Sequence, residues 1–109
     1  MTPMRLTCHC GAVELRVTPS EPLSQARHCT CSFCRRRAGA TVSVPLDALE
    51  IIRGADNLTL YSWGTHTAQH YFCKTCGIYT HHRRRSDPNF YGVNLGALDG
   101  VNHPSDRKA

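Results

Sequence analysis

The chain has 109 residues, with 13 Lys and Arg against 8 Asp and Glu and a formal charge of +5. This length suits a single domain with a modest core. No stretch approaches the roughly 18 consecutive apolar residues of a membrane helix, and no apolar run precedes a cleavage site near the N-terminus. We therefore expect no membrane segment, no signal peptide and a cytoplasmic location, where seven cysteines favour metal binding over disulfides.

Short β-strands are the elements predicted along most of the chain. In 12–17, Val13, Leu15 and Val17 alternate onto one face, as in a half-buried strand. Six further segments are rich in β-branched or aromatic residues and bounded by Pro or Gly, and they predict strands at 40–46, 49–54, 58–63, 68–73, 77–82 and 89–98. Only the run from Ser32 to Arg37 predicts a turn or two of helix. The sequence thus predicts one all-β domain over 1–109 with about seven short strands and a loose tail over about 101–109.

The seven cysteines form two doublets and one triplet, with Cys8 and Cys10 in CHCG, Cys29, Cys31 and Cys34 in CTCSFC, and Cys73 and Cys76 in CKTCG. A structural zinc takes four ligands. Joining the two doublets supplies four and leaves three, which is the most economical division. Zinc ligands are thiolates, so seven thiolates and two Zn²⁺ would bring the charge from +5 to +2. That weakens any inference of nucleic-acid binding from charge.

The doublets are typical of tight metal knuckles. Gly11 and Gly77 each follow the second cysteine, where positive φ lets backbone N–H groups point at sulfur. The alternative is a pair of buried free cysteines in each place. A Cys₄ zinc would tie the N-terminal strand to a strand some 65 positions later and so stabilise a small β domain.

The triplet supplies three ligands, which is the pattern of a catalytic zinc with an open fourth position. The alternative is a closed Cys₃His site completed by a histidine from elsewhere in the chain, namely His9, His70, His81 or His82. Zn²⁺ with three thiolates carries a net charge of −1 and is a poor activator of water. An open site therefore favours a thiol substrate and carbon–sulfur chemistry over hydrolysis.

The order CHCGAVEL, then CTCSFCRRRAG, then LYSW…HYFCKTCGIYTHHRRRSDPNFYGVN resembles the family of the glutathione-dependent formaldehyde-activating enzyme and centromere protein V, from about Thr7 to Gly100. The chain is closer in size to small bacterial members than to the namesake. The resemblance implies a β-tent of small antiparallel sheets and a carbon–sulfur lyase that forms S-hydroxymethylglutathione from glutathione and formaldehyde. It also implies a structural zinc on Cys8, Cys10, Cys73 and Cys76, and a catalytic zinc on Cys29, Cys31 and Cys34.

Two arginine runs, 35–37 and 83–85, adjoin these motifs. A guanidinium binds a carboxylate through two hydrogen bonds, so one arginine of each run could anchor a glutathione-like thiol, although a solvated face is the alternative. Strand alternation should place only one of His81 and His82 inward, and one of these or His70 could act as acid or base. We expect most of the aromatic side chains to be core, with Phe33 in the metal loop as the exception; the expected core aromatics are Trp63, Tyr71, Phe72, Tyr79, Phe90 and Tyr91.

Two functions remain open at this level. In the first, a thiol coordinates zinc at the triplet and attacks an aldehyde, and Ser32 or a histidine steadies the developing alkoxide. In the second, both zincs are structural and the arginine runs of a non-catalytic module bind nucleic acid or an acidic protein. Arginine runs without interleaved aromatics are a weak signal for nucleic acid, so the enzyme is the preferred interpretation.

Overall fold

The computed structural model describes residues 2–27, 32–37, 39–84 and 87–100. Within them lie one α-helix, α1 (Ser32–Arg37), and eight strands: β1 (Met4–Thr7), β2 (Glu14–Val17), β3 (Thr41–Pro45), β4 (Leu49–Arg53), β5 (Leu58–Tyr61), β6 (Gln69–Cys73), β7 (Tyr79–Arg83) and β8 (Phe90–Asn94). The same ranges contain four single turns of 3₁₀ helix, at Leu23–Gln25, Leu46–Ala48, Ala55–Asn57 and Leu95–Ala97. The all-β class and the short helix at Ser32–Arg37 are confirmed.

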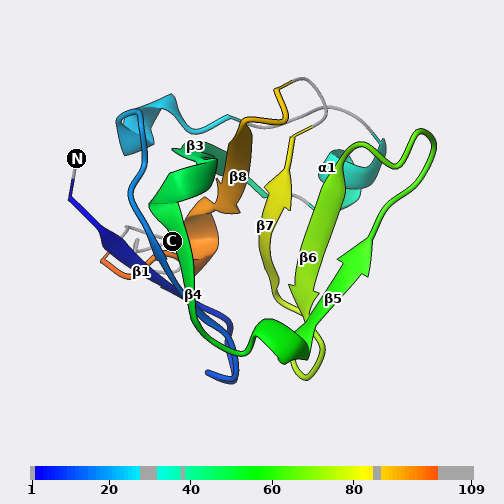
Figure 1. Cartoon of the computed structure of the whole chain (residues 1–109), viewed down its shortest axis with the longest axis horizontal. Helices are drawn as coiled ribbons and strands as arrows, with labels where there is room; N and C mark the ends of the chain where they lie inside the picture. Colours follow the sequence, from blue (N-terminus) through cyan, green and yellow to red (C-terminus); the bar gives the residue numbers. More distant parts are fainter. Residues whose placement is uncertain (1, 28–31, 38, 85–86, 101–109) are drawn as a thin grey trace, which may run out of the picture.

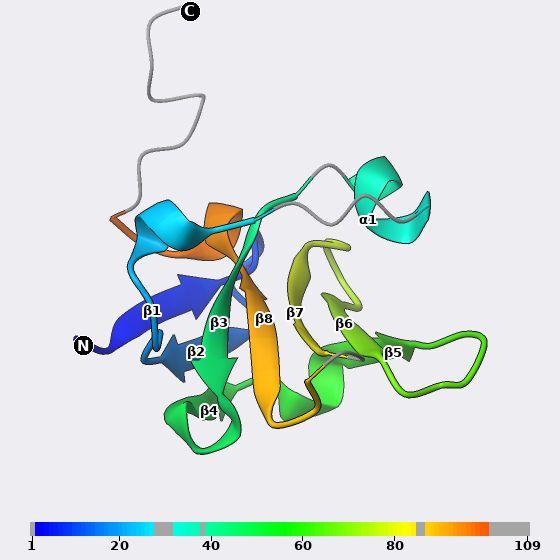
Figure 2. The same ribbon diagram turned by 90° about the horizontal axis from the view of Figure 1, so that it is seen from above.

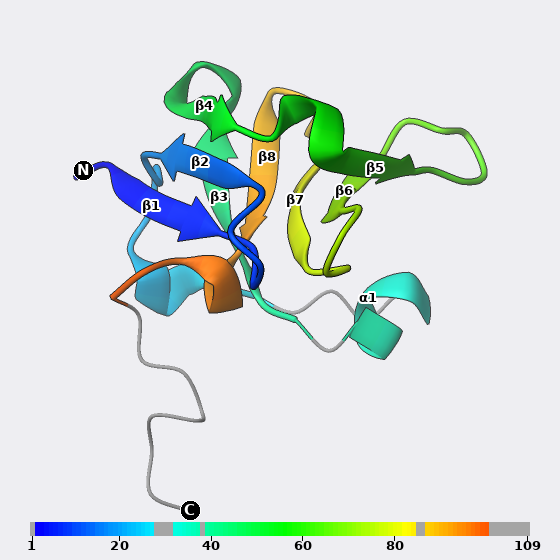
Figure 3. The same ribbon diagram turned by 90° about the horizontal axis from the view of Figure 1, so that it is seen from below.

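The strands form two small antiparallel sheets. One has the order β1-β2-β4 and the other β3-β8-β7-β6-β5. Figures 1, 2 and 3 show the three-stranded sheet beside the half of the larger sheet that holds β3 and β8, while α1 lies at the other half, near β5 and β6. The two halves of the larger sheet therefore have different neighbours: a second sheet on one side and a helix on the other.

The core lies between the small sheet and the β3–β8 half of the larger one. Val13, Leu15 and Val17 are all fully buried, which confirms the predicted face. They pack with apolar side chains of both sheets, including Leu6, Val42, Val44, Val93 and Leu98. Complete burial of one such side chain contributes about 1.5–3 kcal/mol, so this cluster is a principal source of stability.

The first strand, β1, was not predicted. Its sequence MRLT contains only one buried residue, Leu6, and its neighbours are half-buried or exposed. A strand of four residues with a single core contact has too little hydrophobic pattern to be recognised. It forms because its backbone pairs with β2 from Met4↔Val17 to Thr7↔Glu14.

A β-bulge between Tyr71 and Phe72 changes which side chains of β6 and β7 share a face. His70 pairs with His82, and Phe72 pairs with Tyr79. Because the extra residue lies between these pairs, Tyr79 and His82 point to the same side although they are three positions apart.

Within the described ranges, no helix is both long and apolar enough to span a membrane.

Candidate metal centre and the site around Cys34

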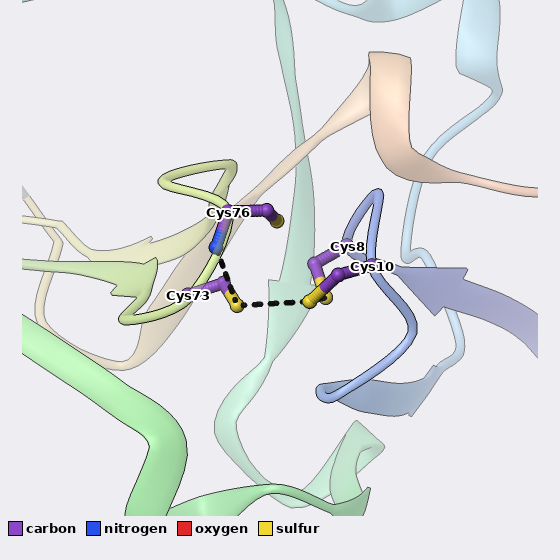
Figure 4. Close-up of side chains that lie close together, drawn as sticks. All are labelled: Cys8, Cys10, Cys73 and Cys76. Carbon is purple, nitrogen blue, oxygen red and sulfur yellow. Dashed lines mark hydrogen bonds between the residues drawn. The ribbon is translucent and has the colours of Figure 1, made fainter.

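The two cysteine doublets meet in space, as predicted. The four Sγ atoms of Cys8, Cys10, Cys73 and Cys76 all lie within 4.8 Å of one another (Figure 4). Cys8 and Cys10 are 3.6 Å apart at sulfur, and Cys10 and Cys73 are 3.7 Å apart. A tetrahedral zinc with Zn–S bonds of about 2.3 Å requires sulfurs about 3.8 Å apart, whereas a disulfide requires about 2.05 Å. The cluster fits a metal ion and not a pair of disulfides.

Each doublet is a tight turn that directs backbone N–H groups at sulfur. The N–H of Val13 donates to Cys8 Sγ at 3.3 Å, and that of Cys76 donates to Cys73 Sγ at 3.5 Å. Gly11 and Gly77 have φ of 83° and 78°, the left-handed conformation that glycine adopts without strain. The prediction of two glycine-dependent knuckles is therefore confirmed.

Other backbone N–H groups favour the thiolate form of Cys76 that a metal needs. Burial alone would raise the pKa of Cys76, but N–H groups of Cys10 and Ile78 point at its sulfur and lower the pKa to about 6. Donors aimed at a sulfur stabilise its charged form. At Cys10 the backbone N–H of Ala12 lowers the pKa, but burial and the neighbouring sulfurs outweigh it and raise the pKa to about 11. The positive charge of a metal ion would be needed to hold all four sulfurs as thiolates.

Gly54 holds the small sheet against this centre. It follows β4 with a φ of 87°, and a Cβ placed on it would lie 2.9 Å from Val13 Cα, next to the first knuckle. On the other side, Asn57 Nδ2 donates to Cys73 Sγ at 3.4 Å. The segment between β4 and β5 therefore contacts both doublets and fixes their relative position.

The third cysteine group is described only at Cys34, because Cys29 and Cys31 lie outside the described residues. Cys34 is 6% exposed and is the buried residue of α1. The negative charge of its thiolate form raises the pKa of Tyr79 of β7, so α1 directs this cysteine toward the β6–β7 face. This face is the one that the bulge supplies with His70, Tyr79 and His82.

Phe33 anchors α1 on an aromatic cluster. Its ring centroid lies 4.4 Å from that of His70, 5.2 Å from Trp63 and 5.5 Å from Tyr61. Tyr61 and Trp63 remain 47% and 43% exposed. The prediction that Trp63 is a core residue is wrong, because it follows the edge strand β5 and nearly half of its surface remains exposed.

Arg37 covers the other end of the same face. Its Cζ lies 3.8 Å from the ring centroid of Tyr79, a cation–π contact. The hydroxyl of Tyr79 makes a short hydrogen bond with Nδ1 of His82. Burial raises the pKa of Tyr79 above its usual value, and burial followed by the charges of His70 and Arg37 lowers that of His82 to about 3. Tyr79 is thus protonated and His82 neutral at neutral pH, and the tautomer of His82 decides which of the two donates in this hydrogen bond.

His70 and Arg37 retain unused hydrogen-bonding groups. Both ring nitrogens of His70, and Nε and Nη1 of Arg37, are buried and have no hydrogen-bond partner within the described part of the chain. Burial and the charge of Arg37 lower the pKa of His70 to about 4. A buried polar group without a partner is costly, so such groups mark a place where a further ligand is expected.

His81 points to the opposite face, as strand alternation predicts. It stacks on Tyr71 with ring centroids 4.6 Å apart, and burial lowers its pKa to about 4. Both faces are covered, however, so His81 is buried and His82 is partly buried rather than one of them being solvated.

His9 is exposed within the first knuckle, between Cys8 and Cys10. Of the four histidines considered for closing the triplet, His70 is the one that contacts Phe33 of α1.

Each arginine run contributes one side chain to the interior of the site. Arg37 does so from α1, whereas Arg35 and Arg36 are exposed. Arg84 is partly buried, and its charge reaches both Tyr79 and His82. Arg85 lies outside the described residues. The sequence did not identify Tyr79 as part of the site, because only the β-bulge brings it onto the face of His82.

The chain belongs to the family of glutathione-dependent formaldehyde-activating enzymes, whose family model matches residues 3–108. A putative glutathione-dependent formaldehyde-activating enzyme of Podospora anserina is 30% identical over 94 residues, which are 83% of this chain and 44% of that protein. A protein of the same description from Halomonas elongata is 34% identical over 79 residues, 64% of this chain and 49% of that protein. This chain therefore spans about half the length of the curated relatives it matches.

A solved structure supports the fold described above. The crystal structure of a Rhodobacter sphaeroides protein is 57% identical, with a TM-score of 0.90 over 94% of both chains. At this identity and coverage, the two proteins share the fold over nearly their whole length.

Proposed function

We propose that the chain binds two zinc ions and promotes the addition of a small thiol such as glutathione to an aldehyde such as formaldehyde. The first zinc is structural and is held by Cys8, Cys10, Cys73 and Cys76. The second is held by Cys29, Cys31 and Cys34, with a fourth position open to the substrate thiol. The observation that carries the proposal is the burial of Cys34 against a face of neutral histidines, a protonated tyrosine and cations.

The sulfur geometry supports the structural zinc. Sulfur distances of 3.6 and 3.7 Å are those of a tetrahedral Zn–S₄ centre. Within the described residues no other group of three or more metal-ligating side chains is this close. The side chains and backbone donors around this centre complete it without a substrate, which fits a structural role.

The reaction needs no oxidant or reductant. The thiolate sulfur attacks the carbonyl carbon, an S–C bond forms, and the C=O π pair moves to oxygen. A proton then joins that oxygen to give the S-hydroxyalkyl product, and the reverse path breaks the same S–C bond. Zinc on three thiolates would supply a coordination site that keeps the substrate sulfur deprotonated and nucleophilic at neutral pH.

The neighbouring side chains have complementary roles. Arg37 and Arg84 place positive charge near Tyr79, on which Cys34 also acts, and this charge would stabilise an oxygen on which negative charge develops there. Tyr79 remains protonated because its burial raises its pKa, and its hydroxyl is hydrogen-bonded to neutral His82. This pair is our candidate for holding and delivering the proton. Phe33 and Trp63 cover His70 and restrict access of water to this face.

The alternative of a non-catalytic module receives less support from these contacts. Binding of nucleic acid or an acidic protein would use the arginines as a solvated basic surface. Arg37 packs on Tyr79, Arg84 has two buried nitrogens, and Arg83 donates to the carbonyl of Pro88 at 2.9 Å. Arg35 and Arg36 are therefore the exposed members of the two runs in the described part of the chain.

Exchange spectroscopy by NMR tests the reaction directly. Glutathione and ¹³C-formaldehyde equilibrate with S-hydroxymethylglutathione, and the protein should increase the exchange rate between free and adducted carbon in proportion to its concentration. The Cys34→Ser variant, loaded with zinc at the first centre, should add nothing to the uncatalysed rate. Equal exchange rates with wild type, with Cys34→Ser and without protein would contradict the proposal.

A further inference from the structure

A cavity of about 390 Å³, open to solvent, lies beside the start of β8. Its lining comes from three parts of the chain: Ser20, Glu21 and Arg27, then Ser43 of β3, and Arg84 with Asp87 and Phe90. Arg84 is the only one of them that the sequence indicated as a candidate for substrate binding. The volume is sufficient for a group the size of an amino-acid backbone, and the lining is polar and charged.

Glu21 and Arg27 neutralise each other in this cavity. Arg27 Nη2 donates to both carboxylate oxygens of Glu21, at 2.8 and 3.0 Å. The backbone N–H of Ser43 donates to the same carboxylate at 3.1 Å. Glu21 is therefore engaged by Arg27 and Ser43, and among the described residues it makes no hydrogen bond to Nε or Nη2 of Arg84.

Arg84 has no such partner. Its Nε and Nη2 are buried, and neither makes a hydrogen bond to the residues that the structure describes. Burial, and then the nearby charge of Arg27, lower the pKa of its guanidinium. A guanidinium does not lose its proton in proteins, so Arg84 remains a cation, and the charges of Glu21 and Asp87 offset the cost of its burial only in part. An anion that enters the cavity would supply the missing acceptor.

We propose that this cavity binds a carboxylate of the substrate thiol through Arg84. A carboxylate matches the planar fork of a guanidinium. Two cations, Arg27 and Arg84, face two anions, Glu21 and Asp87, so the lining is electrically balanced. This balance favours a monoanion over the dianion of inorganic phosphate, because a second negative charge would meet Asp87 without a further cation.

Arg84 connects the cavity to the face beneath Cys34. On one side, the charge of Arg84 affects the pKa values of Tyr79 and His82. On the other side, the charges of Arg27, Glu21 and Asp87 affect the pKa of Arg84 itself. Cys34 also acts on Tyr79. A thiol whose carboxylate is bound at Arg84 would therefore have its sulfur on the side of Tyr79 and Cys34. This inference rests on the proposed function and narrows its substrate class to carboxylate-bearing thiols.

Binding of S-methylglutathione to the zinc-loaded full chain tests the cavity without thiolate chemistry. Titration calorimetry should give measurable affinity for wild type and at least a tenfold weaker Kd for Arg84→Gln. Arg84→Lys should be intermediate, because it keeps the charge but not the fork. Asp87→Asn should bind several-fold more tightly, since it removes the opposing charge. Arg83→Gln is the matched control, because Arg83 lies next in sequence but does not line the cavity, and its Kd should equal that of wild type.

Two results would overturn the inference. One is equal weakening by Arg83→Gln and Arg84→Gln, which would indicate a general charge effect. The other is displacement of S-methylglutathione by inorganic phosphate at a tenfold lower concentration than by acetate, which would indicate a phosphate site. Arg84-dependent binding with no aldehyde exchange would contradict the proposed function alone. Aldehyde exchange with no effect of Arg84→Gln on binding would contradict the carboxylate site alone.

Discussion

The two cysteine regions of this protein differ in how completely the chain satisfies its own polar groups. At the four-cysteine centre, backbone N–H groups and Asn57 donate to sulfur, and the four sulfurs lie within 4.8 Å of one another. Around Cys34, by contrast, His70, Arg37 and Arg84 keep buried nitrogens without hydrogen-bond partners in the described part of the chain.

This difference separates a stabilising role from a binding role. A structural metal site gains most when the protein alone completes it. A site that accepts a ligand must leave donors unused until the ligand arrives, and the free protein is less stable as a result. Substitutions at the first region should therefore act mainly on the fold, and substitutions at the second mainly on ligand binding.

The largest expected effect is that of Cys73→Ser at the first centre. Structural zinc contributes about 10–16 kcal/mol to the folding of small zinc domains, against a typical total stability of about 5–15 kcal/mol. Losing one thiolate should therefore leave no cooperative thermal transition above room temperature, as measured by circular dichroism. The matched control is Cys34→Ser, which should keep a cooperative transition within a few degrees of wild type. Similar losses in both variants would mean that the two regions are equally structural.

Gly54→Ala should cause the next largest loss. The new Cβ would meet the backbone of Ala12 and Val13, and φ at this position is 87°, so neither the space nor the conformation suits alanine. We expect a cost of about 2–4 kcal/mol in denaturant unfolding, from strain of the backbone and displacement of the first knuckle. Gly64→Ala is the control for conformation alone, because Gly64 also has positive φ but open space around its Cβ position. Equal losses would show that contact with the knuckle is unimportant.

Acid should destabilise the protein through its buried histidines. The folded pKa of His81 is about 4, below its ordinary value of 6.5, because burial favours the neutral ring. Between pH 6.5 and 4 the unfolded chain binds a proton that the folded chain does not, so stability falls as the pH falls and is unaffected above 6.5. The loss for this one group is on the order of 3 kcal/mol.

His81→Asn should therefore flatten the decrease in unfolding free energy between pH 7 and pH 4. Zinc loss in acid affects wild type and variant alike, so the difference between their slopes isolates the histidine. His66→Asn is a suitable control, because His66 is exposed and its positive φ is one that asparagine tolerates. Identical slopes for wild type and His81→Asn would contradict the assignment.

The smallest change in stability is expected for Gly92→Ala, which should act on the second region. A Cβ at Gly92 would overlap Cε1 of His82 and lie 3.0 Å from its Nε2, so this ring would have to move. The ring can move, so we expect a loss of only about 1 kcal/mol. The hydrogen bond between Tyr79 and His82 should be disturbed, with a shift of the His82 ring resonances in NMR spectra. Unchanged resonances would show that the ring does not depend on glycine at 92.

The sequence was sufficient to predict the first region and only part of the second. Cysteine spacing and the following glycines predict the four-sulfur centre, because each doublet is a local turn whose geometry depends on neighbouring residues. Alternation predicts the buried face of β2 for the same reason. The Tyr79–His82 pair depends on a β-bulge, and the cavity depends on Glu21, Ser43 and Arg84 meeting across the fold. No short run of residues in the sequence indicates either the bulge or the cavity.

Zinc content and release test the distinction between the two regions most directly. Reduced wild-type protein should contain two zincs per chain, one released quickly to a zinc-sensitive dye and protected by glutathione. Cys34→Ser should contain one zinc, released slowly and unaffected by glutathione. Two zincs in wild type that leave equally slowly, with or without glutathione, would show that both centres are structural and would contradict the proposed function.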